Sequence, residues 1–174
     1  GVVPLRRLSF ADWTSKVSIA SPSEKAITSL MDDKVRFGIY AHELMSDIIC
    51  ASDVDAAMLR FRQSHDIAED EADALEKMAQ MAVSHPDTCR FFAEGNRVVN
   101  EVSLMADGEL ERPDRVVFAD GETWVVDFKT GAPVPQNVAQ VKNYCRAVAA
   151  MGHPAVSGWL LYLHPNGLEV VKAE

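Results

Sequence analysis

Residues 109–129 read ELERPDRVVFADGETWVVDFK, and this stretch decides the fold. Runs rich in β-branched and aromatic residues flank the dipeptide Asp120-Gly121, which is a strong signal for a two-residue hairpin loop. A second dipeptide of the same kind, Asp107-Gly108, lies upstream and follows another β-branched run. The sequence therefore predicts a three-stranded antiparallel meander with strands over residues 97–105, 109–119 and 122–129.

A two-residue loop fixes which residues of the two flanking strands face each other. With Asp120-Gly121 as the loop, counting outward along both strands sets Asp114 opposite Asp127. With Asp107-Gly108 as the loop, the same counting sets Glu101 opposite Asp114. The register thus predicts a row of three carboxylates across three strands.

Carboxylates that face each other directly across strands repel, so a sheet that holds such a row needs a compensating charge. A divalent cation fits this need, because Mg²⁺ binds one or two carboxylates together with waters and phosphate oxygens. Lys129 follows Asp127 by two residues and so projects from the same face of the strand, within reach of the same phosphate. In the alternative interpretation, the acids occupy ordinary strand positions that face solvent.

The remaining sequence alternates further helices and strands around the meander. Upstream, apolar residues recur at helical spacing in three segments, and residues 66–71 form an acidic, solvated connection. Downstream, Pro135 opens a helix to about Met151, and strands over residues 156–164 and 168–172 follow. We expect one mixed α/β domain over residues 1–174, in which a mainly helical part, 1–95, precedes the sheet core, 96–174.

Composition limits the classes of protein that are possible. The 174 residues are 48% hydrophobic and 25% charged, which is typical of a globular domain. The sequence contains no run long enough for a membrane span and no signal peptide, so we expect a cytoplasmic protein without a membrane partner. A first residue of Gly rather than Met indicates either a tag scar or an excised piece of a longer polypeptide, and we expect the C-terminal part of a longer chain.

The formal net charge of −9 argues against a general polyanion binder, since phosphate binding normally accompanies a basic surplus. It does not exclude a nuclease, because a site for divalent cations needs its own carboxylates and the cation then meets the phosphate. The three cysteines are scattered and lack metal-binding spacing.

Several motifs together resemble the PD-(D/E)XK nucleases, and within them the RecB-like branch found in helicase–nuclease proteins of DNA repair. In chain order the motifs are Ala41-His42-Glu43-Leu44, Glu101, Pro113-Asp114-Arg115, Val126-Asp127-Phe128-Lys129-Thr130-Gly131 and Gln140-Val141-Lys142-Asn143-Tyr144. They span most of the chain, from His42 to Leu163. The resemblance implies a restriction-endonuclease-like core, with a mixed central sheet and flanking helices.

The resemblance also implies roles for individual residues. His42, Asp114 and Asp127 match the metal ligands of the family, and Lys129 matches the lysine that positions the attacking water and stabilises charge on the phosphate. Glu101 is a further catalytic candidate, as a second metal ligand or water positioner. The implied cofactor is Mg²⁺, which Mn²⁺ can replace, and three cysteines are too few for the iron–sulfur cluster of some relatives.

Gln140 and Tyr144 match the Q-x-x-x-Y motif of the family and are candidate substrate-binding residues. Each of these assignments has a structural alternative. His42 shares a helix face with apolar residues and could be a hydrogen-bonded core residue, while Glu101 could face solvent. Gln140 and Tyr144 could simply brace the fold.

The function implied is a metal-dependent DNA nuclease that hydrolyses phosphodiester bonds, as an exonuclease module of a helicase–nuclease. The expected partners are DNA and a linked or associated ATP-dependent helicase. The main alternative is a catalytically silent, nuclease-like module that binds DNA ends or a partner protein. A sequence-specific endonuclease of the same fold is a weaker alternative.

Overall fold

The structure is a computed structural model, and it describes residues 22–106 and 108–174. Backbone contacts divide the chain into two compact units, residues 1–34 and 35–174. Helix α1 (Pro22–Ser46) runs from the first unit into the second, and all candidate site residues belong to the second. The other elements before the sheet are the short helix η2 (Ala51–Asp53), α2 (Val54–Ser64), α3 (Glu69–Ser84) and η3 (Cys89–Phe92).

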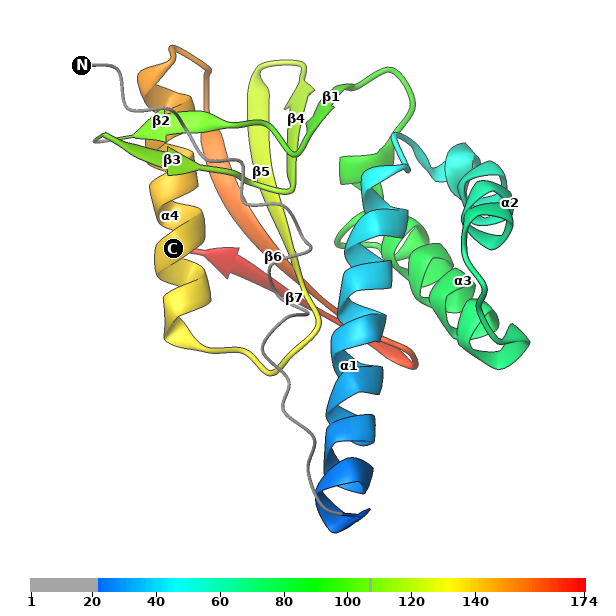
Figure 1. The fold of residues 1–174 in the computed structure, drawn as a ribbon. Coiled ribbons are helices and arrows are strands. Elements are labelled where there is room, and N and C mark those ends of the chain that lie inside the picture. The colour runs from blue at the N-terminus through cyan, green and yellow to red at the C-terminus, as the bar shows by residue number, and fades with distance from the viewer. Residues whose placement is uncertain (1–21, 107) are drawn as a thin grey trace, which may run out of the picture. The chain divides into compact units, whose positions relative to one another are not determined.

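A five-stranded mixed sheet is the centre of the second unit (Figure 1). Its order is β1 (Arg97–Asn100), β4 (Arg115–Ala119), β5 (Glu122–Lys129), β6 (Val156–His164) and β7 (Gly167–Ala173). Strands β5 and β6 are parallel, because helix α4 (Pro135–Ala150) connects them, and the other neighbours are antiparallel. The expected fold class, a mixed sheet with flanking helices, is confirmed.

Apolar side chains alternate along these strands and so form a core on each face of the sheet. One core joins the first three helices and η3 to one face, and it includes Val117, Val126, Phe128 and Leu161. The other joins α4 to the opposite face, and it includes Val116, Val125, Leu160 and Tyr162. The alternation along β5 therefore places Asp127 and Lys129 on the face that α4 covers.

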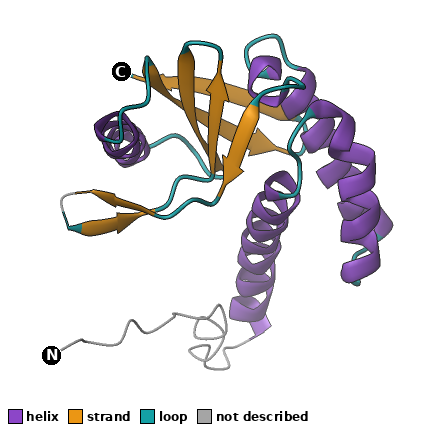
Figure 2. Ribbon diagram, turned by 90° about the horizontal axis from the view of Figure 1, so that it is seen from above, coloured by secondary structure: helices purple, strands orange, loops and turns teal. Residues whose placement is uncertain are grey.

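The predicted meander is wrong in its continuity, because two of its three strands are interrupted. Strands β2 (Leu104–Ala106) and β3 (Glu109–Glu111) form a separate two-stranded sheet beside α4 (Figure 2). The interruption coincides with Glu101, whose φ is 52°, and with Pro113, which lacks an N–H donor. The register on both sides is nevertheless the predicted one, since Asn100 pairs with Arg115 and Ala106 with Glu109.

The two loop glycines adopt a left-handed backbone, but Asp120 does not, so the β4–β5 turn is not of the primed type. The φ angles are 82° at Gly108 and 74° at Gly121. Asp107, the other residue of the first predicted loop, lies outside the described residues.

The acidic connection predicted over residues 66–71 is partly helical, because α3 begins at Glu69. Acidic residues in a first helical turn are favoured by the helix dipole.

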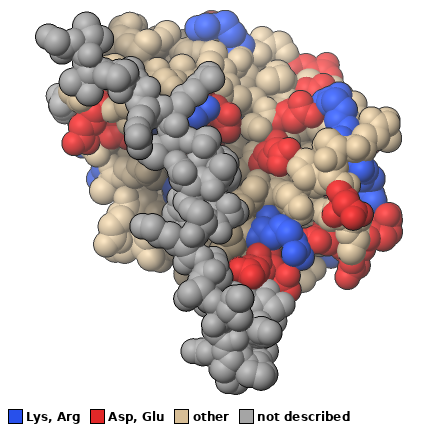
Figure 3. Space-filling view, in the orientation of Figure 1, with Lys and Arg blue, Asp and Glu red and all other residues tan. Residues whose placement is uncertain are grey.

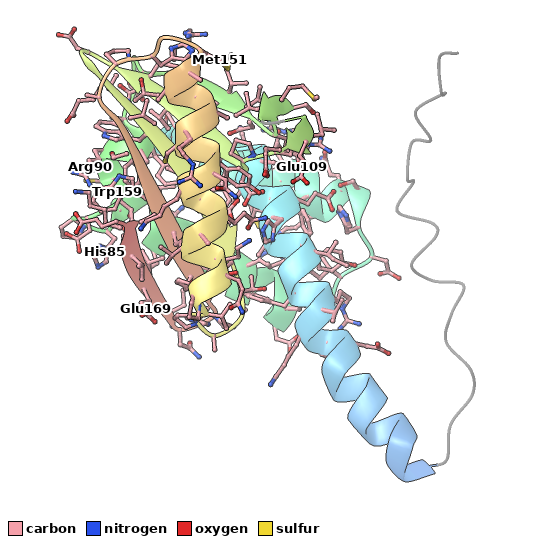
Figure 4. All side chains as sticks on the ribbon, turned by 90° about the vertical axis from the view of Figure 1, so that its left-hand side faces the viewer. His85, Arg90, Glu109, Met151, Trp159 and Glu169 are labelled. Atoms are coloured by element: carbon pink, nitrogen blue, oxygen red, sulfur yellow. The ribbon has the colours of Figure 1, made fainter. Side chains whose placement is uncertain are left out.

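Buried arginine and aromatic contacts tie the helical part to the sheet. The guanidinium of Arg115 is fully buried and donates to the backbone carbonyls of Ile48, Ile49 and Phe91. At strand β6, the guanidinium of Arg90 lies 4.5 Å from the ring centroid of Trp159 (Figure 4). Among the described residues, no helix is both long and apolar enough to cross a membrane.

Candidate active site

The β4–β5 hairpin brings Asp114 and Asp127 together. The observed pairing of Arg115 with Val126 confirms the predicted register, in which Asp114 and Asp127 occupy the next facing positions. Asp114 Oδ2 accepts a hydrogen bond from the backbone N–H of Phe128 at 2.8 Å, which holds the carboxylate against β5. The two carboxyl groups lie close enough for each to shift the pKa of the other. The opposed pair expected from the Asp120-Gly121 turn is therefore present.

The pKa values of the two carboxyl groups are shifted in opposite directions. Burial, followed by the charge of Asp114, raises the pKa of Asp127 to about 7. Burial alone would also raise the pKa of Asp114, but hydrogen bonds with His42 and Asp127 hold it below its usual value. Asp127 is therefore the weaker acid of the pair and Asp114 the stronger.

Lys129 lies beside this pair, and Gln140 of α4 fixes its direction. The Lys129 ammonium donates to Gln140 Oε1 at 3.0 Å and lies 2.8 Å from Asp127 Oδ2. The latter contact is an ion pair without hydrogen-bond geometry, so the buried Oδ2 atom accepts no hydrogen bond. A buried carboxylate oxygen with unused acceptor capacity is unusual and is suited to a cation.

His42 reaches the pair from α1. Its Nδ1 lies 2.9 Å from the carbonyl oxygen of Gly38, and its Nε2 lies 2.7 Å from that of Phe128 and 3.5 Å from Asp114 Oδ2. Because carbonyl oxygens only accept, both ring nitrogens carry protons in this arrangement. The hydrogen bond to Asp114 raises the pKa of His42 to about 9 against the opposing effect of burial.

The carbonyl of Phe128 belongs to this site, and sequence reasoning missed it. It faces His42 Nε2, and the N–H of the same residue binds Asp114. A backbone oxygen has no residue-type signal. Only the position of Phe128 between Asp127 and Lys129 could have pointed to its carbonyl group.

Tyr144 lies one helical turn beyond Gln140 and is nearly buried, with 4% of its surface exposed. Burial, and then the charges of Asp127, Glu111 and Asp114, raise the pKa of Tyr144 above its usual value. Gln140 of the Q-x-x-x-Y motif therefore contacts Lys129, and Tyr144 lies near enough to the carboxylates for their charges to act on it. Glu111, at the end of β3, is a further acid near Tyr144 that the sequence did not single out.

Glu101 is not part of the group. Its backbone N–H does bind the carbonyl of Asp114, at 2.8 Å, as the register requires. Its carboxylate, however, lies 3.3 Å from the guanidinium of Arg112, and its side chain is 53% exposed. The left-handed backbone at Glu101 breaks the strand, so extrapolating the alternation of side chains fails there. The expected row of three carboxylates is therefore wrong in its third member.

The site has the donor types of a divalent-cation site, although its side chains engage one another. Within the described part of the chain, no three His, Cys, Asp or Glu side chains form a ready metal-binding group. The donors are two carboxylates, an imidazole and a backbone carbonyl, and Asp127 Oδ2 among them accepts no hydrogen bond. Oxygen-rich sets with one imidazole suit Mg²⁺ and Mn²⁺. The residues present therefore fit the expected metal.

No protein-family model matches the chain, and no curated protein matches it significantly. Among solved structures, the chain is similar to the crystal structure of SSO0001, with a TM-score of 0.36 and 16% sequence identity. That match covers 74% of this chain and 68% of the other. A likeness this weak carries no argument about function.

Proposed function

We propose that the chain is a metal-dependent DNA nuclease that hydrolyses phosphodiester bonds, as an exonuclease module of a cytoplasmic helicase–nuclease. The observation that carries the proposal is the coupled pair of Asp114 and Asp127 with Lys129 directly beside it. Strongly shifted acids that are grouped with a cationic side chain are typical of catalytic sites. The motif order of the RecB-like nucleases supports the same function.

Asp114, Asp127, the imidazole of His42 and the carbonyl of Phe128 would hold Mg²⁺ or Mn²⁺. The bound ion would supply a positive charge for the scissile phosphate and acidify a water molecule. Metal binding requires a neutral imidazole and ionised carboxylates, and the raised pKa values of His42 and Asp127 oppose both. Metal binding is therefore expected to strengthen as the pH rises.

Lys129 acts on the phosphate and on the attacking water. Its ammonium is held between Asp127 Oδ2 and Gln140 Oε1, which fixes it at the carboxylate pair. A cation held in this way neutralises negative charge that develops on the phosphate without first having to reorganise. Gln140 then acts as a positioning residue for Lys129, in addition to any contact with substrate.

The second candidate is a catalytically silent module that binds DNA ends or a partner protein. The observation that favours it is that both ring nitrogens of His42 already bind carbonyl groups, so neither offers a lone pair to a metal. The two functions differ in their response to Mg²⁺. A silent module would leave DNA intact at every Mg²⁺ concentration.

The test is the release of nucleotides from linear double- and single-stranded DNA in Mg²⁺. We expect Asp127→Ala and Lys129→Ala to abolish release, while Asp120→Asn, in the exposed β4–β5 turn, retains it. Circular dichroism and unfolding curves establish that each variant is folded. Wild-type cutting by either site variant would overturn the assignment, and intact DNA with the wild-type protein would favour the silent module.

A further inference from the structure

Gly38 lies in the interior of α1 at a close contact with the end of β5. A Cβ atom placed on Gly38 would lie 2.8 Å from Thr130 Oγ1 and 3.8 Å from Thr130 Cβ. Real Cβ atoms essentially never approach another heavy atom within 3.0 Å. Thr130 directly follows Lys129, so the helix touches the chain next to the candidate site. Only glycine allows this separation without a shift of Thr130.

Glycine is a poor choice for the inside of a helix on local grounds. It destabilises a helix relative to alanine, because it loses more backbone freedom on folding. Position 38 has no positive φ that would call for glycine. The contact with Thr130 is therefore the reason in the structure for glycine at this position.

The same residue orients the imidazole of His42. The carbonyl oxygen of Gly38 lies 2.9 Å from His42 Nδ1, one helical turn further along α1. This bond directs the other nitrogen, Nε2, toward the carbonyl of Phe128 at 2.7 Å and toward Asp114 at 3.5 Å. Partners of this kind on the second nitrogen of a histidine ligand set its tautomer and direction.

We propose that Gly38 is a positioning residue, because its missing side chain lets α1 approach Thr130 closely enough for His42 to reach Phe128 and Asp114. The inference rests on the proposed function for its role in metal binding. The geometric part does not, since it concerns contacts within the metal-free chain. A side chain at position 38 would force either Thr130 or the helix to shift, and a shift of the helix away from β5 would withdraw the imidazole.

The test compares Gly38→Ala, Thr130→Ala and the double variant. Thr130→Ala removes Oγ1 and leaves only the 3.8 Å contact with Cβ, so the double variant has room for the new methyl group. Gly131→Ala is the matched control, because a Cβ there meets nothing within 4 Å and the backbone is not left-handed. Thermal unfolding without metal checks that all four variants fold.

Two properties are measured. The first is the imidazole N–H signal of His42 in metal-free, ¹⁵N-histidine-labelled protein, which is identified with His42→Gln. The second is the dissociation constant for Mn²⁺ by isothermal titration calorimetry. We expect Gly38→Ala to shift or broaden the N–H signal and to weaken Mn²⁺ binding by roughly 10- to 100-fold, as for other supports of a histidine ligand. The double variant should recover the behaviour of Thr130→Ala.

A wild-type N–H signal and Mn²⁺ affinity in Gly38→Ala would overturn the inference, and so would a double variant as impaired as Gly38→Ala. If the wild-type protein binds no Mn²⁺, the metal site of the proposed function is wrong. The N–H signal then still decides whether Gly38 positions His42.

Discussion

Asp127 sits where a carboxylate is costly to ionise. Only 4% of its side chain is exposed, and the charge of Asp114 also acts on it. Lys129 offsets part of that cost but does not cancel it, since the pKa of Asp127 remains raised to about 7. An ionised carboxylate at this position lowers the stability of the metal-free fold, and a bound cation would remove that cost. This behaviour is expected of a cation-binding site.

Replacing Asp127 by Asn should stabilise the metal-free protein at high pH. The folded-state pKa is raised, so the neutral carboxyl contributes stability below the ordinary value near 4, and this contribution is lost as the pH rises through 7. Because Asn never ionises, the advantage of Asp127→Asn over the wild type should be larger at pH 8.5 than at pH 5 by roughly 1 to 3 kcal/mol.

Urea unfolding in EDTA at the two pH values measures this difference. Asp120→Asn, in the exposed turn, is the control and should show no such dependence on pH. If Asp127→Asn is less stable than the wild type at pH 8.5, ionisation of Asp127 does not destabilise the folded protein.

At the level of elements, the long hairpin from β1 to β4 is divided at Glu101 and Pro113. The outer part, β2–β3, leaves the main sheet and packs on α4 through Leu104, which is 5% exposed. Its outer side carries Met105 and Leu110, which pair across the strands. The pairing register is the same on both sides of the break. The Glu101 side chain, however, does not follow the alternation expected for a continuous strand.

The backbone at Glu101 yields a prediction that separates structure from catalysis. Its φ of 52° suits glycine and penalises β-branched residues. We expect Glu101→Gly to equal or exceed the wild-type stability by up to about 1 kcal/mol and Glu101→Val to lose about 1 to 2 kcal/mol. DNA cleavage by the folded Glu101→Gly variant should stay within about threefold of wild type, since the carboxylate lies on Arg112.

Unfolding curves and initial cleavage rates measure both effects. A folded Glu101→Gly variant that cuts DNA a hundredfold more slowly would return Glu101 to the catalytic group, as the register argument first suggested.

The sequence predicted those features that residues close together in the chain determine, such as a turn and the register of the strands beside it. The Asp120-Gly121 turn sets the facing positions of Asp114 and Asp127 because a two-residue loop leaves no freedom of register. The contact of Gly38 with Thr130 and the carbonyl partners of Arg115 could not be predicted. These contacts join elements far apart in sequence and involve backbone atoms or a missing side chain, so no pattern of residue types marks them.

For the molecule as a whole, charge is the main constraint on a role with DNA. The net charge is −9, and Figure 3 shows acidic and basic side chains interspersed on the visible face. In the helical part, Arg36, Arg60 and Arg62 each lie within ion-pair distance of at least one carboxylate. Such a chain offers little positive charge to attract the phosphates of DNA, so a bound cation must provide much of the attraction.

DNA binding should therefore depend on a divalent cation. Ca²⁺ is the useful probe, because we expect it to bind without supporting hydrolysis. By fluorescence anisotropy, the wild-type chain should bind labelled DNA at least about tenfold more tightly in Ca²⁺ than in EDTA, and Asp127→Ala should lose this difference. Equal affinity in Ca²⁺ and EDTA would show that DNA binds elsewhere on the molecule.

The most direct test of a catalytic site built on Asp114, Asp127 and Lys129 is single-turnover cleavage of end-labelled DNA by wild type and Lys129→Met, with Mn²⁺ affinity measured in parallel. Wild type should cut only when Mg²⁺ is present. Lys129→Met should bind Mn²⁺ with similar affinity but cut at least about 100-fold more slowly, because Lys129 stabilises charge on the phosphate rather than binding the metal. Cleavage by Lys129→Met at the wild-type rate, or cleavage that persists in EDTA, would contradict the account.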